Sequence, residues 1–196
     1  MNIIFILLAV LLSHSAKAFD TNPRNIKTIT QPSGYKTIAY NNRYTFAIPK
    51  DYKIKRMSEQ NLEFMAIVDS DGHAVFFVHE ILITNKLLLN PDGYNLKNYT
   101  RRQLLSAIYD KNHLSNDEVN ETRKIIFELS NNVAVYKRDG FIFFREDRTD
   151  KPKIKTSFYL SKNDDVLTIS FWSDNEKLIM NVIQSFHVKN QSITLD

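Results

Sequence analysis

No cysteine occurs in this chain, and glycine is scarce, with four residues among 196. Without thiols, no disulfide bond can stabilise the fold. The glycines stand far apart, at Gly34, Gly72, Gly93 and Gly140. A P-loop, a dinucleotide-binding fingerprint and a nucleophile elbow each need closely spaced glycines, so the sequence excludes all three. Because it contains no other cofactor signature, we expect the protein to work without a cofactor.

Long apolar runs are missing as well. A membrane-spanning helix needs about 20 consecutive apolar residues, whereas the longest run, from Ile3 to Leu12, holds ten. A short polar stretch follows it, and then Ala16-Lys17-Ala18, which has the small-x-small form that signal peptidase cleaves. We interpret residues 1–18 as a secretory signal peptide, although its first two residues include no Lys or Arg. The mature chain would begin at Phe19 and keep no stable membrane anchor.

The charge of the mature chain is almost balanced. Loss of Lys17 with the leader reduces the 26 basic residues to 25, against 22 acidic ones. This excess is too small for the basic surface that nucleic-acid binding requires, so we expect no nucleic-acid partner. A secreted chain without cysteine suits a Gram-negative periplasm better than a eukaryotic extracellular space, where disulfides are usual. The expected location is therefore the periplasm.

Large apolar side chains are what the chain has in quantity. Hydrophobic residues make up 43% of the sequence, with thirteen phenylalanines and nine tyrosines among them. A chain of this size buries roughly 70% of its unfolded surface, enough for one core without metal ions or crosslinks. We predict one α+β domain over 35–190, an N-terminal tail or edge segment over 19–34, and a C-terminal tail over 191–196.

Alternation of apolar residues with smaller or polar ones predicts an antiparallel sheet. Tyr44, Phe46 and Ile48 follow this alternation, which ends at Pro49 because proline cannot donate a ladder hydrogen bond. Asn41-Asn42 before them suits a hairpin turn, since asparagine tolerates positive φ. Short connections elsewhere require antiparallel neighbours. The strands that we predict cover 44–48, 62–68, 74–83, 133–137, 141–146, 154–160 and 166–172.

Helical periodicity predicts helices that cover this sheet. The segment 96–113 has one broad apolar face. A capping box at Ser115 to Glu118 predicts a second, short helix that changes to strand near Ile125. A further capping box at Ser173 to Glu176 precedes the clearest amphipathic stripe in the chain, from Leu178 to Phe186.

Two adjacent aromatic residues bear on how the sheet is covered. Phe143 and Phe144 lie next to each other on one predicted strand, so they point to opposite faces. This favours a sheet covered on both faces. The predicted fold class is therefore α+β, with an antiparallel β-sheet and covering helices.

Two parts of this pattern resemble the PsbP-like superfamily. The run Tyr44 to Tyr52 has the form aromatic-x-aromatic-x-aliphatic-Pro-x-Asp-aromatic and looks like the strand exit near the start of PsbP-like domains. Leu167 to Trp172, with the helix ending in Ile183-Gln184-Ser185-Phe186, looks like their closing strand and helix. The superfamily includes the extrinsic photosystem II protein, a nuclear Ran-release factor and DcrB-type bacterial periplasmic proteins. The resemblance implies an α/β/α-like sandwich and a protein-binding role, and it supplies no catalytic residues.

Histidines and acidic loops are where metal sites would show. The segment Asp69 to Gly72 begins like a calcium loop, and Glu80 stands at its twelfth position. Gly72 falls at the fourth position rather than the sixth, however, and strand-forming residues follow, so we interpret the segment as a hairpin turn and expect no metal site. The histidines of the mature chain form no metal-binding motif, and we expect each to be structural or solvated. They are His73, His79, His113 and His187.

Paired carboxylates would support glycan hydrolysis. The candidates lie among Lys and Arg residues in segments that we expect to be turns, so we interpret them as solvated charges and assign no catalytic residue. The candidates are Glu146, Asp147, Asp150, Asp164 and Asp165.

The loop over 85–94 holds three consecutive leucines, which cannot all face one core. At least one is expected at the surface, where an apolar residue ringed by polar ones is typical of a protein-binding site. The alternative is that the leucines plug the end of the sheet. The candidate partner-binding residues are Leu87, Leu88, Leu89 and Tyr94.

These observations favour a non-enzymatic secreted or periplasmic protein that binds a protein partner. Within that class we favour an immunity protein that neutralises a toxin delivered to the periplasm by a neighbouring cell. The alternative is a cell-envelope hydrolase, which needs two carboxyl groups roughly 5 to 9.5 Å apart in a cleft. The sequence leaves the oligomeric state open.

Overall fold

The computed structural model describes residues 21–59, 62–80, 100–109, 120, 123–124, 127–148, 153–162 and 165–189. The predicted leader and the C-terminal tail lie outside these residues. In the part of the chain that is described, no helix is long and apolar enough to cross a membrane.

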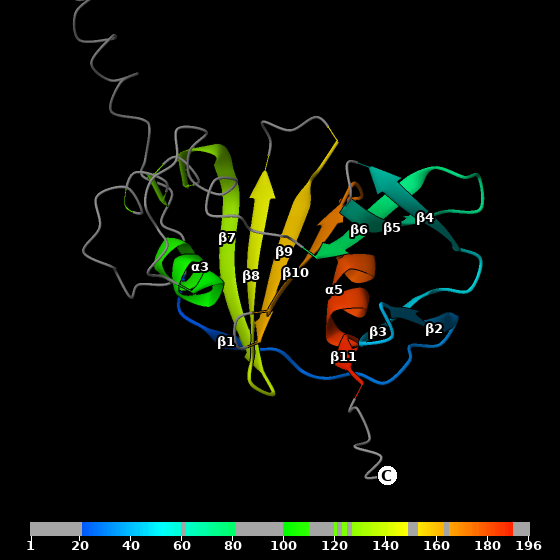
Figure 1. Cartoon of the computed structure of the whole chain (residues 1–196), viewed down its shortest axis with the longest axis horizontal. Coiled ribbons are helices and arrows are strands. Elements are labelled where there is room, and N and C mark those ends of the chain that lie inside the picture. The colour runs from blue at the N-terminus through cyan, green and yellow to red at the C-terminus, as the bar shows by residue number, and fades with distance from the viewer. Residues whose placement is uncertain are drawn as a thin grey trace, which may run out of the picture.

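Two β-sheets make up most of the described chain (Figure 1). The strands of the larger sheet are β1 (Arg24–Asn25), β4 (Lys53–Glu59), β5 (Leu62–Val68), β6 (Ala74–Glu80), β7 (Ser130–Arg138), β8 (Phe141–Arg148), β9 (Thr156–Lys162) and β10 (Asp165–Phe171). They lie in the order β1-β7-β8-β9-β10-β6-β5-β4. The smaller sheet has the order β11-β3-β2, from β2 (Tyr35–Tyr40), β3 (Tyr44–Pro49) and β11 (His187–Val188). Neighbours are antiparallel in both sheets, apart from the parallel pair β1 and β7.

Helices lie on both faces of the larger sheet. On one face, α3 (Arg101–Tyr109) packs against β7 and β10. On the other, α5 (Glu176–Gln184) lies between the two sheets and contacts β3 (Figure 1). The adjacent residues Phe143 and Phe144 on β8 are both 0% exposed, so the prediction of a sheet covered on both faces is confirmed at this strand.

The larger sheet separates two apolar cores. The bigger core fills the space between this sheet, α5 and the smaller sheet, and the rings of Phe46, Phe76 and Phe171 meet there. The smaller core lies under α3, where Leu105 and Ile108 are fully buried. The described structure is thus rich in β-sheet with few helices, which fits the predicted α+β class.

Several sequence-based predictions of secondary structure differ from the structure. The sequence does not predict β4, because four of its seven residues are charged and no apolar period marks it. β7 begins at Ser130 and residues 127–129 are helical, whereas we expected the change from helix to strand near Ile125. β4 lacks apolar spacing, whereas the residues before β7 fit both helical and strand spacing, so local spacing does not fix where that strand begins.

The start of α5 also differs from the predicted capping box. Asn175 caps the helix, and its side-chain oxygen accepts a hydrogen bond from the backbone N–H of Leu178 at 3.1 Å. The hydroxyl of Ser173, the expected cap, instead accepts one from the backbone N–H of Asn175 at 3.1 Å. Asparagine is as good a cap as serine and lies nearer to the apolar stripe, which explains the shift.

The apolar stripe of α5 is buried as predicted. Phe186, just after the helix, is 1% exposed. Its ring centroid lies 5.5 Å from that of Tyr44 and 5.7 Å from that of Phe141, so it joins the smaller sheet to the larger one. The buried residues of the helix itself are Leu178, Ile179, Val182 and Ile183.

Replacing Phe186 with alanine is expected to lower the free energy of unfolding by about 3 to 5 kcal/mol, because it removes a buried ring from the joint between the sheets. Chemical denaturation measures this loss. The control is Ile54→Ala, at a residue 42% exposed, for which we expect a loss of about 1 kcal/mol or less. A similarly small loss for Phe186→Ala would show that the ring does not hold the sheets together.

Candidate functional site

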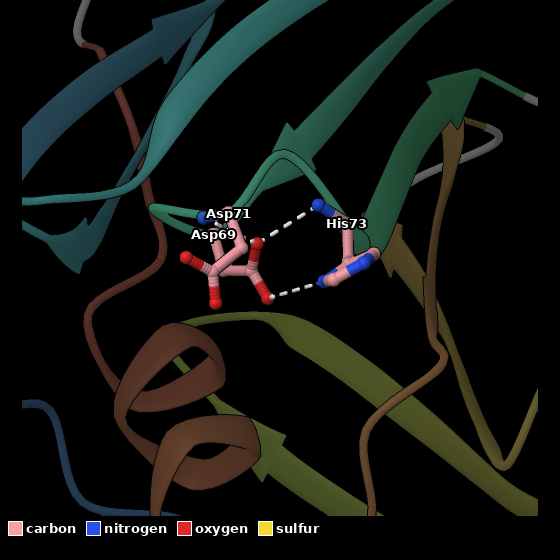
Figure 2. Close-up of side chains that lie close together, drawn as sticks. All are labelled: Asp69, Asp71 and His73. Carbon is pink, nitrogen blue, oxygen red and sulfur yellow. Dashed lines mark hydrogen bonds and ion pairs between the residues drawn. The ribbon is translucent and has the colours of Figure 1, made fainter.

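The turn between β5 and β6 gathers Asp69, Asp71 and His73 (Figure 2). One carboxylate oxygen of Asp69 accepts hydrogen bonds from the backbone N–H groups of Asp71, at 3.1 Å, and His73, at 2.8 Å. The other oxygen lies 3.7 Å from Nδ1 of His73. Gly72 has a φ of +87°, which glycine adopts without steric cost. The predicted hairpin turn is confirmed.

The same three residues form a potential metal-ligand group, with ligand atoms within 4.8 Å of one another. The carboxylate of Asp69 is already used by the backbone of the turn. The side chain of His73 is 80% exposed. The hydrogen bonds of a closed hairpin account for this geometry, so we assign the three residues a structural role.

The other histidines lie elsewhere in the fold. His79 is on β6, where burial lowers the pKa of its imidazole. His187 is exposed on β11, and His113 lies outside the described residues. Among the histidines that the structure describes, only His73 belongs to a group of three or more potential metal ligands.

Glu146 lies inside the protein on β8 and is 2% exposed. One carboxylate oxygen accepts hydrogen bonds from the phenols of Tyr109, at 2.8 Å, and Tyr159, at 3.4 Å. The other oxygen accepts from the Ser130 hydroxyl at 3.3 Å and lies 3.2 Å from the Arg148 guanidinium. The expectation that Glu146 is a solvated turn charge is therefore wrong, because protein donors have replaced water around it.

Arg145 and Asp147 lie on the opposite face of β8. The Arg145 guanidinium donates to the two oxygens of Asp147, at 2.9 and 3.1 Å, and to the two oxygens of Glu176, at 2.6 and 2.8 Å. The Thr156 hydroxyl also donates to Asp147, at 2.7 Å. Because Glu176 is the first residue of α5, its two-point pair with Arg145 fastens the start of the helix to β8. Asp147 is thus also part of a strand rather than a turn.

These contacts give structural roles to the carboxylates considered for hydrolysis. Glu146 and Asp147 are adjacent on one strand and point to opposite faces, so they cannot line one cleft together. Asp165, at the start of β10, forms an ion pair with Arg43. Asp150 and Asp164 lie outside the described residues. The residues described therefore give no support to a hydrolytic carboxylate pair.

The described structure presents a different candidate surface, the outer edge of β4. Leu87, Leu88, Leu89 and Tyr94 lie outside the described residues, so their role in partner binding stays a prediction. Among the described strands, β4 pairs with β5 alone and ends the larger sheet. Its outer edge therefore carries backbone N–H and C=O groups that no other described strand pairs with.

The side chains of β4 are both basic and apolar. Since side chains alternate along a strand, Lys53, Lys55 and Met57 share one face. Ile54 and Arg56 share the other. All five are exposed, and Ile54 and Met57, at 42% and 47%, are large apolar residues of the kind that usually lies inside.

A groove of about 200 Å³ lies along β4 and β5, next to the end of β2, with Tyr40, Arg56, Met57 and Phe64 among its lining residues. The Tyr40 hydroxyl donates to the backbone carbonyl of Glu63 at 3.3 Å, which ties the smaller sheet to β5 at this point. The groove is smaller than the roughly 300 to 1,000 Å³ of pockets for drug-sized molecules. Its size suits a side chain of a protein partner.

Comparison with known proteins assigns the chain to no family. No protein-family model matches the chain, and a search of curated proteins finds no match. The PsbP-like resemblance rests on the short motifs in 44–52 and 167–186 and stays a prediction.

Because the phenols of Tyr109 and Tyr159 are buried around Glu146, we predict that the protein loses stability in alkali. Burial raises the pKa of Tyr109 and of Tyr159, and the nearby charge of Glu146 raises both further. The folded protein then keeps phenol protons that the unfolded chain releases above about pH 10, so the free energy of unfolding falls as the pH rises beyond that value.

We expect this fall to be shallower in the double variant Tyr109→Phe, Tyr159→Phe, in which neither phenol can ionise. Urea denaturation of both proteins between about pH 9 and about pH 11.5 measures the two slopes. Equal slopes would mean that the two phenols ionise as easily in the folded protein as in the unfolded chain.

Proposed function

We propose that this protein is a non-enzymatic, secreted protein-binding protein, and that its partner adds an extended acidic segment to the free edge of β4. The observation that carries the proposal is an edge strand with exposed apolar side chains, whose outer backbone pairs with no strand in the described part of the chain. An extended segment of another protein satisfies such a backbone by continuing the hydrogen-bond ladder. Binding then needs no catalytic residue and no cofactor.

The charges on β4 select the partner. Lys53, Lys55 and Arg56 are exposed, and both faces of the strand carry at least one of them next to an apolar residue. Opposite charges on neighbouring strands attract, and apolar side chains that lie opposite each other pack together. A segment with acidic residues opposite Lys53, Lys55 and Arg56 and apolar residues opposite Ile54 and Met57 therefore matches this edge.

A second copy of the same strand matches this edge less well. Antiparallel pairing of two β4 strands centred on the middle of the strand places Arg56 opposite its own copy, or places Lys55 opposite Arg56 of the other copy. Like charges directly opposite each other destabilise a pair of strands. Basic residues on an edge strand also discourage self-association in general. The partner that we propose is thus a different protein.

The biological setting follows from the leader and from the absence of an enzyme motif. Secretion through residues 1–18 would place the protein in the periplasm, and the resemblance to PsbP-like proteins, with their α/β/α sandwich, agrees with a protein-binding role. The partner class that we favour is a toxin delivered by a neighbouring cell, which makes this chain an immunity protein. A toxin gene next to the gene for this chain would support that assignment most directly.

A defined peptide tests strand addition. We expect a synthetic peptide of glutamate and valine, with glutamates placed to face Lys53, Lys55 and Arg56 and valines elsewhere, to shift the backbone amide NMR signals of β4. The double variant Lys55→Glu, Arg56→Glu should bind this peptide about tenfold more weakly, because two cross-strand attractions become repulsions. Its melting temperature should not change, since both residues are exposed.

Matched controls separate strand addition from general attraction. Lys177→Glu changes an exposed charge on α5 and should bind the peptide like the wild type. A peptide with N-methyl groups at alternate residues loses ladder donors and should not bind. Equal binding of a lysine–valine peptide, or shifts centred away from β4, would refute the proposal.

A further inference from the structure

A second pocket, separate from the groove beside β4, lies where the smaller sheet meets the ends of β8, β9 and β10. Its volume is about 140 Å³. Tyr44 from β3 and Val188 from β11 line it on one side, and Phe141 from β8 lines it on the other. None of the contacts in the proposed β4 interface involves this pocket.

The floor of the pocket is apolar and fully formed. Phe141, Leu160, Leu167 and Phe186 line it, and all four are buried. The rings of Phe141 and Phe186 meet edge to face, with their centroids 5.7 Å apart. A cavity of about 150 Å³ with apolar walls accepts a benzene molecule. This floor therefore accepts one ring, or a branched chain of similar size.

The mouth of the pocket carries an excess of positive charge. Among its lining residues are Arg43, Lys162 and Asp165. Arg43 pairs with Asp165, and both side chains are partly exposed. The Nζ of Lys162 lies 5.1 Å from the ring centroid of Phe141 and has no carboxylate partner among the described residues. Lys162 is thus a cation at the edge of the apolar floor without a carboxylate partner among the described residues.

We propose that this pocket binds a small monocarboxylate, whose ring or branched chain fills the floor and whose carboxylate pairs with Lys162. A single negative charge balances Lys162, the lining cation that has no carboxylate partner among the described residues. Hydrogen bonds between ionised groups are roughly twice as strong as neutral ones, so the charged head adds affinity that the small floor cannot supply alone. A bound ligand bridges the two sheets and stabilises their contact.

Phenylacetate is a suitable probe, and phenylacetamide is its uncharged control of nearly the same shape. Titration of the full mature chain should shift the amide signals of residues 43–44, 160–162 and 186–188, and phenylacetate should raise the melting temperature. Phenylacetamide should bind about tenfold more weakly, because it lacks the charge that pairs with Lys162. Failure of phenylacetate to shift these signals, or equal binding of the two compounds, would overturn the proposal.

Two variants locate the site. Lys162→Gln should weaken phenylacetate binding about tenfold and leave phenylacetamide binding unchanged. Lys177→Gln, at an exposed lysine on α5, should bind both compounds like the wild type. Val188→Phe, at a half-buried residue of the pocket wall, should block both compounds by filling the space. Unchanged phenylacetate affinity in Lys162→Gln would show that the lysine only covers the ring of Phe141.

Discussion

Burial of both faces of β8 is the constraint on which the rest of the fold depends. Each face needs its own cover, which α3 supplies on one side and α5 with the smaller sheet on the other. The charged run Arg145 to Arg148 ends this strand, and its side chains alternate between the two covers. Buried charges are tolerated only when paired. Glu146 pairs on the side of α3, and Arg145 pairs with Glu176 of α5, so β8 fixes the position of both helices.

Burial of the sheet decreases from β8 towards β4. β9, β10 and β6 are still largely buried, whereas β4 has exposed side chains on both of its faces. The charged residues inside the sheet are occupied by internal ion pairs, but those of β4 face solvent. The paired charges hold the domain together. The interface that we propose lies instead on β4, which pairs with β5 alone among the described strands.

Local spacing predicts the elements whose pattern is dictated by burial. The stripe of α5 and the turn at Gly72 were found in this way. Local spacing does not find β4, because an exposed edge strand has no apolar period. The signal for it is indirect, since the predicted strand at 62–68 needs an antiparallel neighbour, which β4 supplies. Glu146 was misjudged because a charged run looks solvated, while its partner Tyr109 is 37 residues away in the chain. Pairing between such distant elements leaves no signal in local spacing.

The central claim is that the outer edge of β4 is open in the free protein. Amide hydrogen exchange, followed residue by residue by NMR, tests it most directly. In an antiparallel edge strand only alternate N–H groups bond to the inner neighbour. The account therefore predicts slow exchange at every second amide of β4, fast exchange at the amides between them, and protection along the whole of β5. Uniformly slow exchange along β4 would contradict it, because the edge would then already be covered.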